Sequence, residues 1–213
     1  MDQDVTHKLI SEAIGADHQY IDLCATELRN ATTNDDKIRW RNQITWTFAR
    51  HAISEELTMY PALEKHLGLQ GKELVAVDLE QHQAVRISLV PQTPTWESRL
   101  TPQTQIKEDL YKLQSLDPAH PEFTPLLDRL MDDFHHHVEH EKNEDMPALE
   151  AKLSREESNK LAIYWQQTKK MTPTRSHPSA PNRPYAENLA GLLAMPIDKI
   201  GDWVRSFPKD TKM

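Results

Sequence analysis

The residues of this chain that could do chemistry follow one pattern, which occurs twice. Phe-x-x-His-x-x-x-Glu, followed by Pro-Ala-Leu, spans residues 48–63 and again residues 134–149, with every shared residue 86 positions apart. On a helix, side chains four residues apart lie one above the other on the same face. Each copy therefore presents an imidazole beside a carboxylate, as in His51 with Glu55. Such a pair is a set of metal ligands, and the chain carries it twice.

Two further histidines lie on stripes of apolar residues at helical spacing. His18 lies four residues after Ile14 and three before Ile21, so it should face the inside of its helix. His82 lies four residues after Asp78, which again places an acid and an imidazole on one helix face. A single core histidine is usually hydrogen-bonded through its ring nitrogens. Four such histidines together are harder to explain in that way.

The composition predicts that helices position these side chains. The chain of 213 residues has five glycines and 7% aromatic residues, and no alternating Val/Ile/Thr run indicates a strand. Apolar periodicity predicts long helices at about residues 5–30, 36–66, 72–90 and 122–153. Shorter helices are expected at about 102–116 and at 155–170, the second after the Ser-x-x-Glu capping box that starts at Ser154. Pro61 should kink or break the last turn of its helix.

Four long helices joined by short turns predict an all-α protein, namely an up-and-down antiparallel four-helix bundle with an additional helix. Residues 1–170 are expected to form this bundle and to contain the metal site. From Met171 onward the chain is punctuated by prolines. Residues 171–213 are therefore expected to be a proline-rich tail that packs on the bundle as a strap, because so short a segment can hardly bury a core alone.

In such a bundle, facing helices bring their inward side chains together. The candidate metal ligands are His18, His51, Glu55, His82, His137 and Glu141. Four imidazoles with two carboxylates suit two iron ions, whereas structural zinc sites use thiolates and calcium or magnesium sites use little histidine. The first two histidines would hold one ion and the other two the second, with the glutamates spanning both. The alternative is six separately hydrogen-bonded residues, although buried histidine and glutamate are uncommon.

Other residues near these motifs are further candidates. Asp78 is either an additional ligand or an acceptor that orients a ligand histidine. Tyr60, which precedes the proline, could bind ferric iron as a phenolate or pack in the core. Glu56 has Lys142 as its counterpart in the second copy, so it is expected at the surface or behind a ligand. Solvent exposure is expected of the histidines that flank the second motif, which are His135, His136 and His140.

The order His, His-x-x-x-Glu, His, His-x-x-x-Glu over residues 18–141 resembles the hemerythrin-like family, also called the HHE cation-binding domain. The resemblance covers about residues 5–153, and the motif is specific because it occurs twice in register. It implies an up-and-down four-helix bundle with a non-haem centre of two iron ions, oxo- or hydroxo-bridged, held by the six residues named above. Members of the family bind dioxygen, sense oxygen, iron or redox state, store iron or decompose peroxide. The fold alone therefore does not determine which of these functions the chain has.

Two departures from the oxygen-carrying hemerythrins bear on the function. Those carriers have a histidine where this chain has Asp78, and they space their last histidine and acid five apart, where His137 and Glu141 are four apart. A more anionic site favours ferric iron, which weakens the case for a reversible carrier. Dioxygen or peroxide is the expected ligand. Three classes of function remain: a redox enzyme that decomposes peroxide or reduces dioxygen, an oxygen, nitric oxide or iron sensor, and an iron-binding protein without turnover.

Charge, hydropathy and cysteine content indicate which partners and which cellular location to expect. A net charge of −8 at pH 7 argues against nucleic acid or an anionic membrane as a partner. The sequence has no run of 18 apolar residues and begins with acidic residues, unlike a secretory signal. Its single cysteine, Cys24, cannot form an internal disulfide, so a cytoplasmic protein is expected, with Cys24 in the core. No motif supports a hydrolase, a nucleotide-binding protein or a zinc finger, and the sequence does not identify a protein partner.

Overall fold

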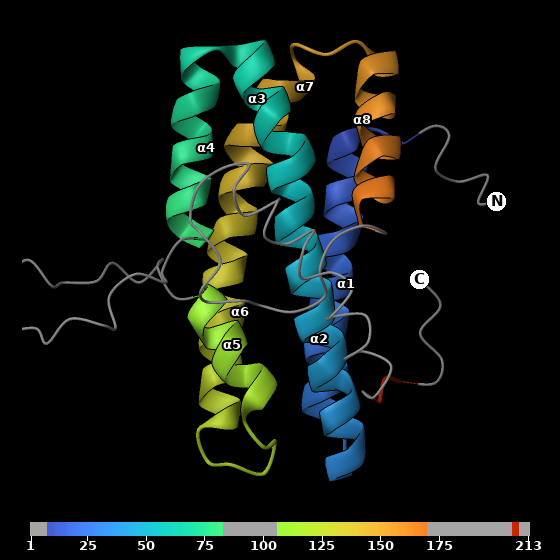
Figure 1. The fold of residues 1–213 in the computed structure, drawn as a ribbon, viewed down its shortest axis with the longest axis vertical. Coiled ribbons are helices and arrows are strands. Elements are labelled where there is room, and N and C mark those ends of the chain that lie inside the picture. The colour runs from blue at the N-terminus through green and yellow to red at the C-terminus, as the bar shows by residue number, and fades with distance from the viewer. Residues whose placement is uncertain (1–7, 83–105, 170–205, 209–213) are drawn as a thin grey trace, which may run out of the picture.

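The computed structural model of the chain describes residues 8–82, 106–169 and 206–208 (Figure 1), without the side chains of 79–82 and 106–108. Every regular element of the described residues is helical, which confirms the prediction of an all-α protein. In chain order these are α1 (Ile10–Asn30), α2 (Asn34–Ser54), η2 (Glu55–Met59), α3 (Tyr60–Leu67), α4 (Leu69–His82), α5 (Ile106–Ser115), α6 (Phe123–His140), η4 (Glu141–Asp145), α7 (Met146–Glu150) and α8 (Arg155–Thr168). The η elements are π-helical segments.

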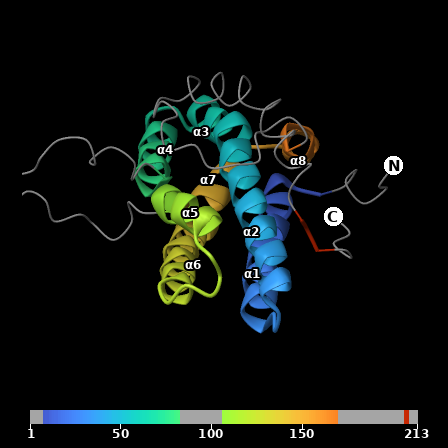
Figure 2. The ribbon, with the colours of Figure 1, turned by 60° about the horizontal axis from the view of Figure 1, so that its bottom comes forward.

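The helices form an antiparallel bundle whose four positions are filled in chain order (Figures 1 and 2). α1 takes the first position and the continuous helix α2–η2–α3 the second. α4 and α5 follow one another in the third, and α6–η4–α7 takes the fourth. Successive positions run in opposite directions, and α8 packs on the outside, beside α1. This arrangement confirms the predicted up-and-down four-helix bundle with an additional helix.

The ends of these helices follow from local chemistry. Thr33 precedes α2 and its hydroxyl accepts a hydrogen bond from the backbone N–H of Asp36, at 3.1 Å. Ser154 and Glu157 form the predicted capping box at the start of α8, each side chain accepting from the other residue's backbone N–H. Gly68 ends α3 with φ at 61°, a left-handed conformation that glycine adopts without steric cost.

Several helix boundaries differ from the predicted ones. Residues 8 and 9 are not helical, so the first helix begins at Ile10. The third long helix begins at Leu69, before Gly71, because the left-handed Gly68 reverses the chain at once. Its predicted continuation to residue 90 lies outside the described residues, as do residues 102–105 of the next helix.

Both copies of the motif contain a π-helical segment that sequence periodicity did not predict. The backbone N–H of Tyr60 bonds to the carbonyl of Glu55 five residues earlier, and Met146 bonds to Glu141 in the same way. A proline follows at once in each copy and lies in the first turn of α3 or α7. Proline lacks an N–H and fits at a helix start, where that group has no intrahelical partner. The expected kink at Pro61 therefore takes the form of a wide turn inside a continuing helix.

Buried apolar side chains form two clusters, one at each end of the bundle. The lower core lies among the parts of α1, α2, α5 and α6 that are drawn at the bottom of Figure 1. It consists of Ile21, Cys24, Ala25, Leu28, Ile44, Phe48, Leu110, Leu113, Phe123, Leu126, Leu127, Leu130, Met131 and Phe134. The upper core consists of Ile10, Ala13, Ile14, Met59, Tyr60, Ala62, Leu63, Val75, Met146, Leu149, Ala162 and Trp165. Cys24 is fully buried in the lower core, as expected. A layer of buried polar residues separates the two cores.

The tail is described only at residues 206–208, where it contacts α2. Arg39 donates a hydrogen bond to the carbonyl of Phe207 at 3.2 Å, and the side chain of Asn42 donates to the carbonyl of Ser206 at 3.0 Å. The rings of Trp46 and Phe207 meet edge to face, with centroids 6.2 Å apart. The division of the chain at residue 170, with the rest as a strap, stays a prediction.

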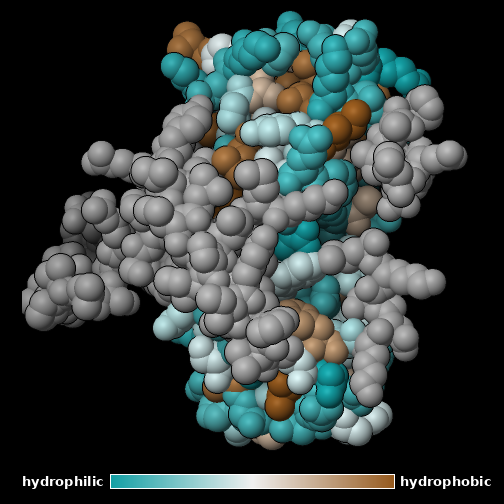
Figure 3. Space-filling model, turned by 45° about the vertical axis from the view of Figure 1, so that its right-hand side comes forward, coloured by the Kyte–Doolittle hydropathy of each residue, from teal (hydrophilic) through white to brown (hydrophobic). Residues whose placement is uncertain are grey.

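On the face shown in Figure 3, the described residues are mostly hydrophilic, with small and separate apolar areas. The large apolar side chains that are exposed, such as Leu69 and Tyr164, are scattered over several helices. Among the described residues, no helix combines the length and apolar character that crossing a bilayer requires.

Candidate metal centre

The polar layer between the two cores contains most of the predicted metal ligands. His18 of α1 lies with its Nε2 atom 3.2 Å from Nε2 of His51, on α2. Nε2 of His51 lies 2.8 Å from Oε1 of Glu55, and Nε2 of His18 lies 3.1 Å from Oε2 of Glu141. All four side chains are buried, and their ligand atoms lie within 4.8 Å of one another. Segments more than a hundred residues apart therefore converge on a space that could hold a metal ion.

His137 also lies beside the two glutamates. Its Nε2 atom is 3.7 Å from Oε1 of Glu55 and 3.5 Å from Oε2 of Glu141. The same Glu55 oxygen faces His51, and the same Glu141 oxygen faces His18. Each glutamate thus has one oxygen near both His137 and one of the other two histidines. We call these five residues the central cluster.

The structure places none of the other predicted ligands in this cluster. His82 is the last residue of α4, and its side chain is not among those described. Asp78, one turn earlier on α4, is fully buried. Tyr60 is buried in the upper core, and burial together with Asp78 raises the pKa of its phenol well above the usual value. A protonated phenol favours the packing role over a phenolate ligand. Metal binding by each of these residues stays a prediction.

Burial and mutual contact shift the protonation of the central cluster. Burial and the nearby His51 lower the pKa of His18 to about 3, so this imidazole keeps the neutral form that binds metals. Burial opposes protonation of His51, but the Glu55 carboxylate outweighs it and raises the pKa of His51 to about 10. Burial and the charge of Glu55 raise the pKa of Glu141 to about 8. The two glutamates cannot easily share the space as anions without a cation between them.

The apolar residues of the repeated motif seal this layer from both ends. Phe48 and Phe134 meet edge to face below the histidines, with centroids 4.9 Å apart, and the ring of Phe134 lies 5.6 Å from that of His18. At the other end of the motif, Leu63 and Leu149 are buried in the upper core. The motif therefore specifies both the polar ligands and the apolar walls that keep bulk water out.

The additional helix α8 supports the cluster through Asp17, a residue that sequence analysis did not single out. Trp165 donates its indole N–H to one Asp17 oxygen at 3.1 Å, and Lys169 contacts the other at 2.6 Å. The first oxygen lies 4.0 Å from Nδ1 of His51, and the rings of His51 and Trp165 meet at 5.6 Å. Burial opposes ionisation of Asp17, but His51 and Lys169 outweigh it and lower its pKa. Asp17 therefore places a fixed negative charge behind His51.

The structure decides between the two alternatives for Glu56 and corrects the expectation for His140. Glu56 is buried, which excludes the surface position and leaves the alternative, a position behind a ligand. His140 is not a solvent-facing residue like His135 and His136, because only a quarter of its side chain is exposed and its Nδ1 lies 3.0 Å from Oδ2 of Asp145. Asp145 was not predicted as a functional residue, since its five-residue spacing from His140 places the two on one face only in a π turn.

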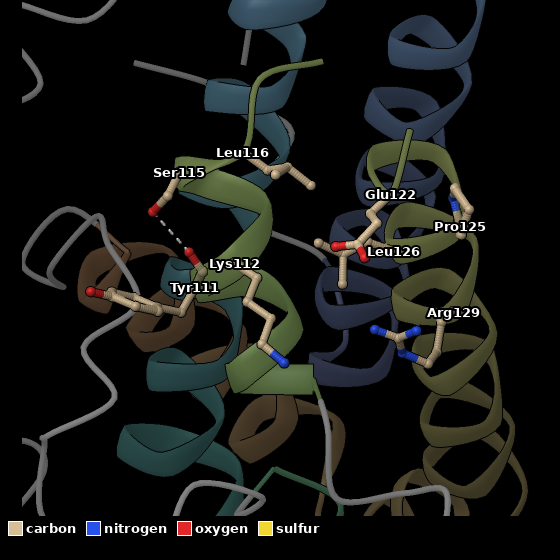
Figure 4. Close-up of a pocket in the computed structure, with 8 residues that line it drawn as sticks. All are labelled: Tyr111, Lys112, Ser115, Leu116, Glu122, Pro125, Leu126 and Arg129. Atoms are coloured by element: carbon tan, nitrogen blue, oxygen red, sulfur yellow. Dashed lines mark hydrogen bonds between the residues drawn. The ribbon is translucent and has the colours of Figure 1, made fainter. Parts of the chain in front are cut away.

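A surface cavity of about 640 Å³ lies elsewhere, between α5 and α6 (Figure 4). Its charged lining residues are Lys112, Glu122 and Arg129, and no histidine lines it. Arg129 is already engaged, because two of its nitrogens contact the buried carboxylate of Asp109 at 2.6 and 3.0 Å. This cavity is therefore separate from the candidate metal centre, which is a buried layer of side chains.

Comparisons with known proteins agree with this geometry. The family described as the Hemerythrin HHE cation binding domain matches residues 9–149. The chain is also similar to an uncharacterized hemerythrin-like protein of Schizosaccharomyces pombe, with 40% identity over 199 residues that cover 93% of this chain and 88% of that protein. No solved structure matches the chain. The family match includes every residue of the central cluster and ends before α8. The chain therefore belongs to the hemerythrin HHE cation-binding family.

Proposed function

We propose that this chain is a non-haem diiron protein that reacts with dioxygen or hydrogen peroxide. His18 and His51 would hold one iron ion, and His137 with His82 the other. Glu55 and Glu141 would bridge the two ions. The observation that carries this proposal is the position of the two glutamates, because one oxygen of each lies within 3.7 Å of Nε2 of His137 and of Nε2 of a histidine of the other pair.

The chemistry of the donor atoms fits iron. Both carboxylate oxygens of Glu141 are buried and accept no hydrogen bond from the described residues, so a cation would supply the missing partner. Imidazoles and carboxylates suit iron, while the only thiol of the chain, Cys24, lies in the lower core. Burial raises the pKa of this thiol to about 12, which keeps it protonated and unsuited to metal binding. Iron bound here would supply redox chemistry and open coordination positions for a small oxygen species.

The protein around the centre has two tasks in this proposal. The aromatic pair Phe48 and Phe134 and the upper core exclude bulk water, which strengthens electrostatic interactions at the ligands. The carboxylate of Asp17 keeps the ring of His51 in place and makes its other nitrogen a better donor. The buried acids near the centre favour the more highly charged ferric ion. This argues for turnover of peroxide or dioxygen rather than reversible oxygen carriage.

A second candidate function, a sensor of oxygen, iron or redox state, rests on the tail. Phe207 contacts Trp46 and Arg39 on α2, the helix that also carries His51. A change of charge at the centre could therefore reach the docked tail through one helix. An iron-binding protein without turnover is the remaining alternative.

Metal analysis of the purified chain tests the centre itself. We expect two iron ions per chain in the wild type, and fewer in His51→Ala and in His137→Ala, because each substitution removes a buried histidine that would hold a different ion. His136→Ala, an exposed neighbour on α6, is the matched control and should keep both ions. Unchanged iron in His51→Ala and His137→Ala would discard the ligand assignment.

Assays of the iron-loaded protein separate the three functions. Rapid oxygen evolution from added peroxide, lost in His137→Ala, supports the enzyme. A stable charge-transfer band on exposure to oxygen without turnover supports sensing. If the protein binds iron but shows neither oxygen evolution nor the charge-transfer band, it is an iron-binding protein without turnover. That result contradicts the proposed reactivity.

A further inference from the structure

A second group of metal-binding side chains lies outside the central cluster. It consists of Asp78 on α4, His140 at the end of α6 and Asp145 at the end of η4, and we call it the Asp78 cluster. Nδ1 of His140 lies 3.0 Å from Oδ2 of Asp145 and 3.6 Å from Oδ1 of Asp78. The three ligand atoms lie within 4.8 Å of one another, which is close enough for one ion to contact all of them.

The internal repeat accounts for the central cluster but not for this one. His51 and Glu55 recur as His137 and Glu141, 86 residues later. At the same offset, the counterparts of His140 and Asp145 are Ser54 and Met59. An imidazole and an acid have thus been added to the second copy only, on the side that faces α4. The symmetric centre does not need them, so they require an explanation of their own.

The π turn is what brings these two residues together. η4 spans Glu141–Asp145, so its wide turn begins directly after His140 and ends at Asp145. Residues five apart lie nearly above one another in such a turn, whereas in an α-helix they diverge. The segment that adjusts the helix to Pro147 therefore also aligns an imidazole with a carboxylate.

The carboxylates of this cluster are buried with unmet hydrogen-bonding capacity. The side chains of Asp78 and Asp145 are both 0% exposed. Neither oxygen of Asp78 accepts a hydrogen bond from the described residues. The Oδ1 atom of Asp145 accepts none from them either. A buried carboxylate without enough partners is strongly unfavourable, and two of them side by side repel each other. A cation between them removes both costs.

One side of the cluster is open. A quarter of the His140 side chain is exposed, whereas the two carboxylates are not. An ion could enter past this ring, and water could complete its coordination there. One imidazole with two carboxylates suits a divalent transition ion such as Mn²⁺, Fe²⁺ or Zn²⁺ better than Ca²⁺, which prefers oxygen ligands alone.

We propose that Asp78, His140 and Asp145 form a separate site for one divalent transition-metal ion, which joins α4 to η4 beside the central cluster. This site is additional to the proposed diiron centre, and its ion would bind without iron at the central cluster. At the positions of His140 and Asp145, the first copy of the motif has Ser54 and Met59. These two residues indicate which substitutions the fold accepts there.

A count of bound Mn²⁺ tests this site. In an equilibrium titration of the metal-free full-length chain, followed by the electron paramagnetic resonance signal of free Mn²⁺, the wild type should bind one ion more per chain than Asp145→Asn or His140→Ser. His140→Ser places the residue of the first copy at a partly exposed position, so it should fold even if the buried Asp145→Asn does not. His136→Ser is the control and should bind as many ions as the wild type.

The central cluster must be tested separately in the same experiment. His51→Ala should lose binding at the central cluster and retain the ion that His140→Ser loses. The site is overturned if His140→Ser and a folded Asp145→Asn bind as many Mn²⁺ ions as the wild type, with unchanged affinity. It is also overturned if His51→Ala removes all binding, because the Asp78 cluster would then only support the central one. Failure of the diiron proposal would appear instead as unchanged iron content in His51→Ala.

Discussion

At the scale of single residues, the position of His51 depends on groups that are far away in the sequence. Asp17 holds a carboxylate oxygen 4.0 Å from Nδ1 of His51, and that carboxylate is itself held by Trp165 and Lys169 of the C-terminal part. A carboxylate behind a ligand histidine fixes the ring and increases the basicity of the nitrogen that faces the metal. The matched family region ends at residue 149, so α8 adds this support from outside it.

Replacement of Asp17 tests this support. In Asp17→Asn the fixed charge is lost while the shape is kept, so we expect iron affinity to fall by roughly 10- to 100-fold, the usual effect of removing such a partner. Asp22→Asn is the control, since Asp22 lies on the same helix and, among the described residues, pairs only with the exposed His135, at 2.7 Å. Affinity would be measured by competition with a chelator of known strength. Equal affinity in Asp17→Asn and wild type would show that Asp17 only anchors α8.

The sequence predicted residues whose partners lie at α-helical spacing and missed those whose partners do not. His18, His51 and His137 were recognisable because each lies on an apolar stripe, and the structure brings them together. Asp145 was not recognisable, because a period of 3.6 residues does not pair it with His140. Asp17 was missed for a different reason: its partners on and after α8 are about 150 residues away, and no local pattern predicts such contacts.

At the scale of elements, the hairpin of α3 and α4 depends on two glycines with different tasks. Gly68 turns the chain with a left-handed backbone. Gly71, in the first turn of α4, lets the two helices approach, because a Cβ atom there would lie 2.1 Å from the carbonyl oxygen of Leu63. The sequence indicates the first role, because Gly68 lies just after the end of the helix predicted at about residues 36–66. It could not predict the second, since a close approach depends on how two helices pack.

Substitution of Gly71 should separate these roles. Gly71→Ala forces a methyl group against the α3 backbone, and overpacking of this kind costs about 1–3 kcal/mol of unfolding free energy. Gly15→Ala is the control, because nothing lies within 4 Å of a Cβ there. In the middle of α1 that change should stabilise by roughly 0.5–1 kcal/mol. Urea unfolding of both variants measures the difference, and equal stability of Gly71→Ala and wild type would contradict the close packing of α3 on α4.

At the scale of the whole molecule, a buried polar layer divides the hydrophobic core into two parts. The central cluster lies between the lower core, which contains Phe134, and the upper core, which contains Met59. Neither half is large, and small cores are marginally stable. The layer that joins them contains like-charged groups, as in Glu55 beside Glu141. An ion that neutralises this layer should therefore stabilise the entire bundle rather than one helix, because all four bundle positions meet there or next to it.

Removal of metal should accordingly lower the unfolding temperature. A ligand that binds only the folded state stabilises it by about 2.7 kcal/mol at a free concentration one hundred times its dissociation constant. For a chain of this size each kcal/mol shifts the midpoint by roughly 2–4 °C, so chelation should lower it by roughly 5–10 °C. Calorimetry of iron-loaded and chelated protein at equal concentration measures this shift. His51→Ala should show a smaller shift, because it has lost a ligand. Identical midpoints for loaded and chelated wild type would mean that the polar layer is stable by itself, and that the acids and imidazoles of the central cluster satisfy one another without an ion.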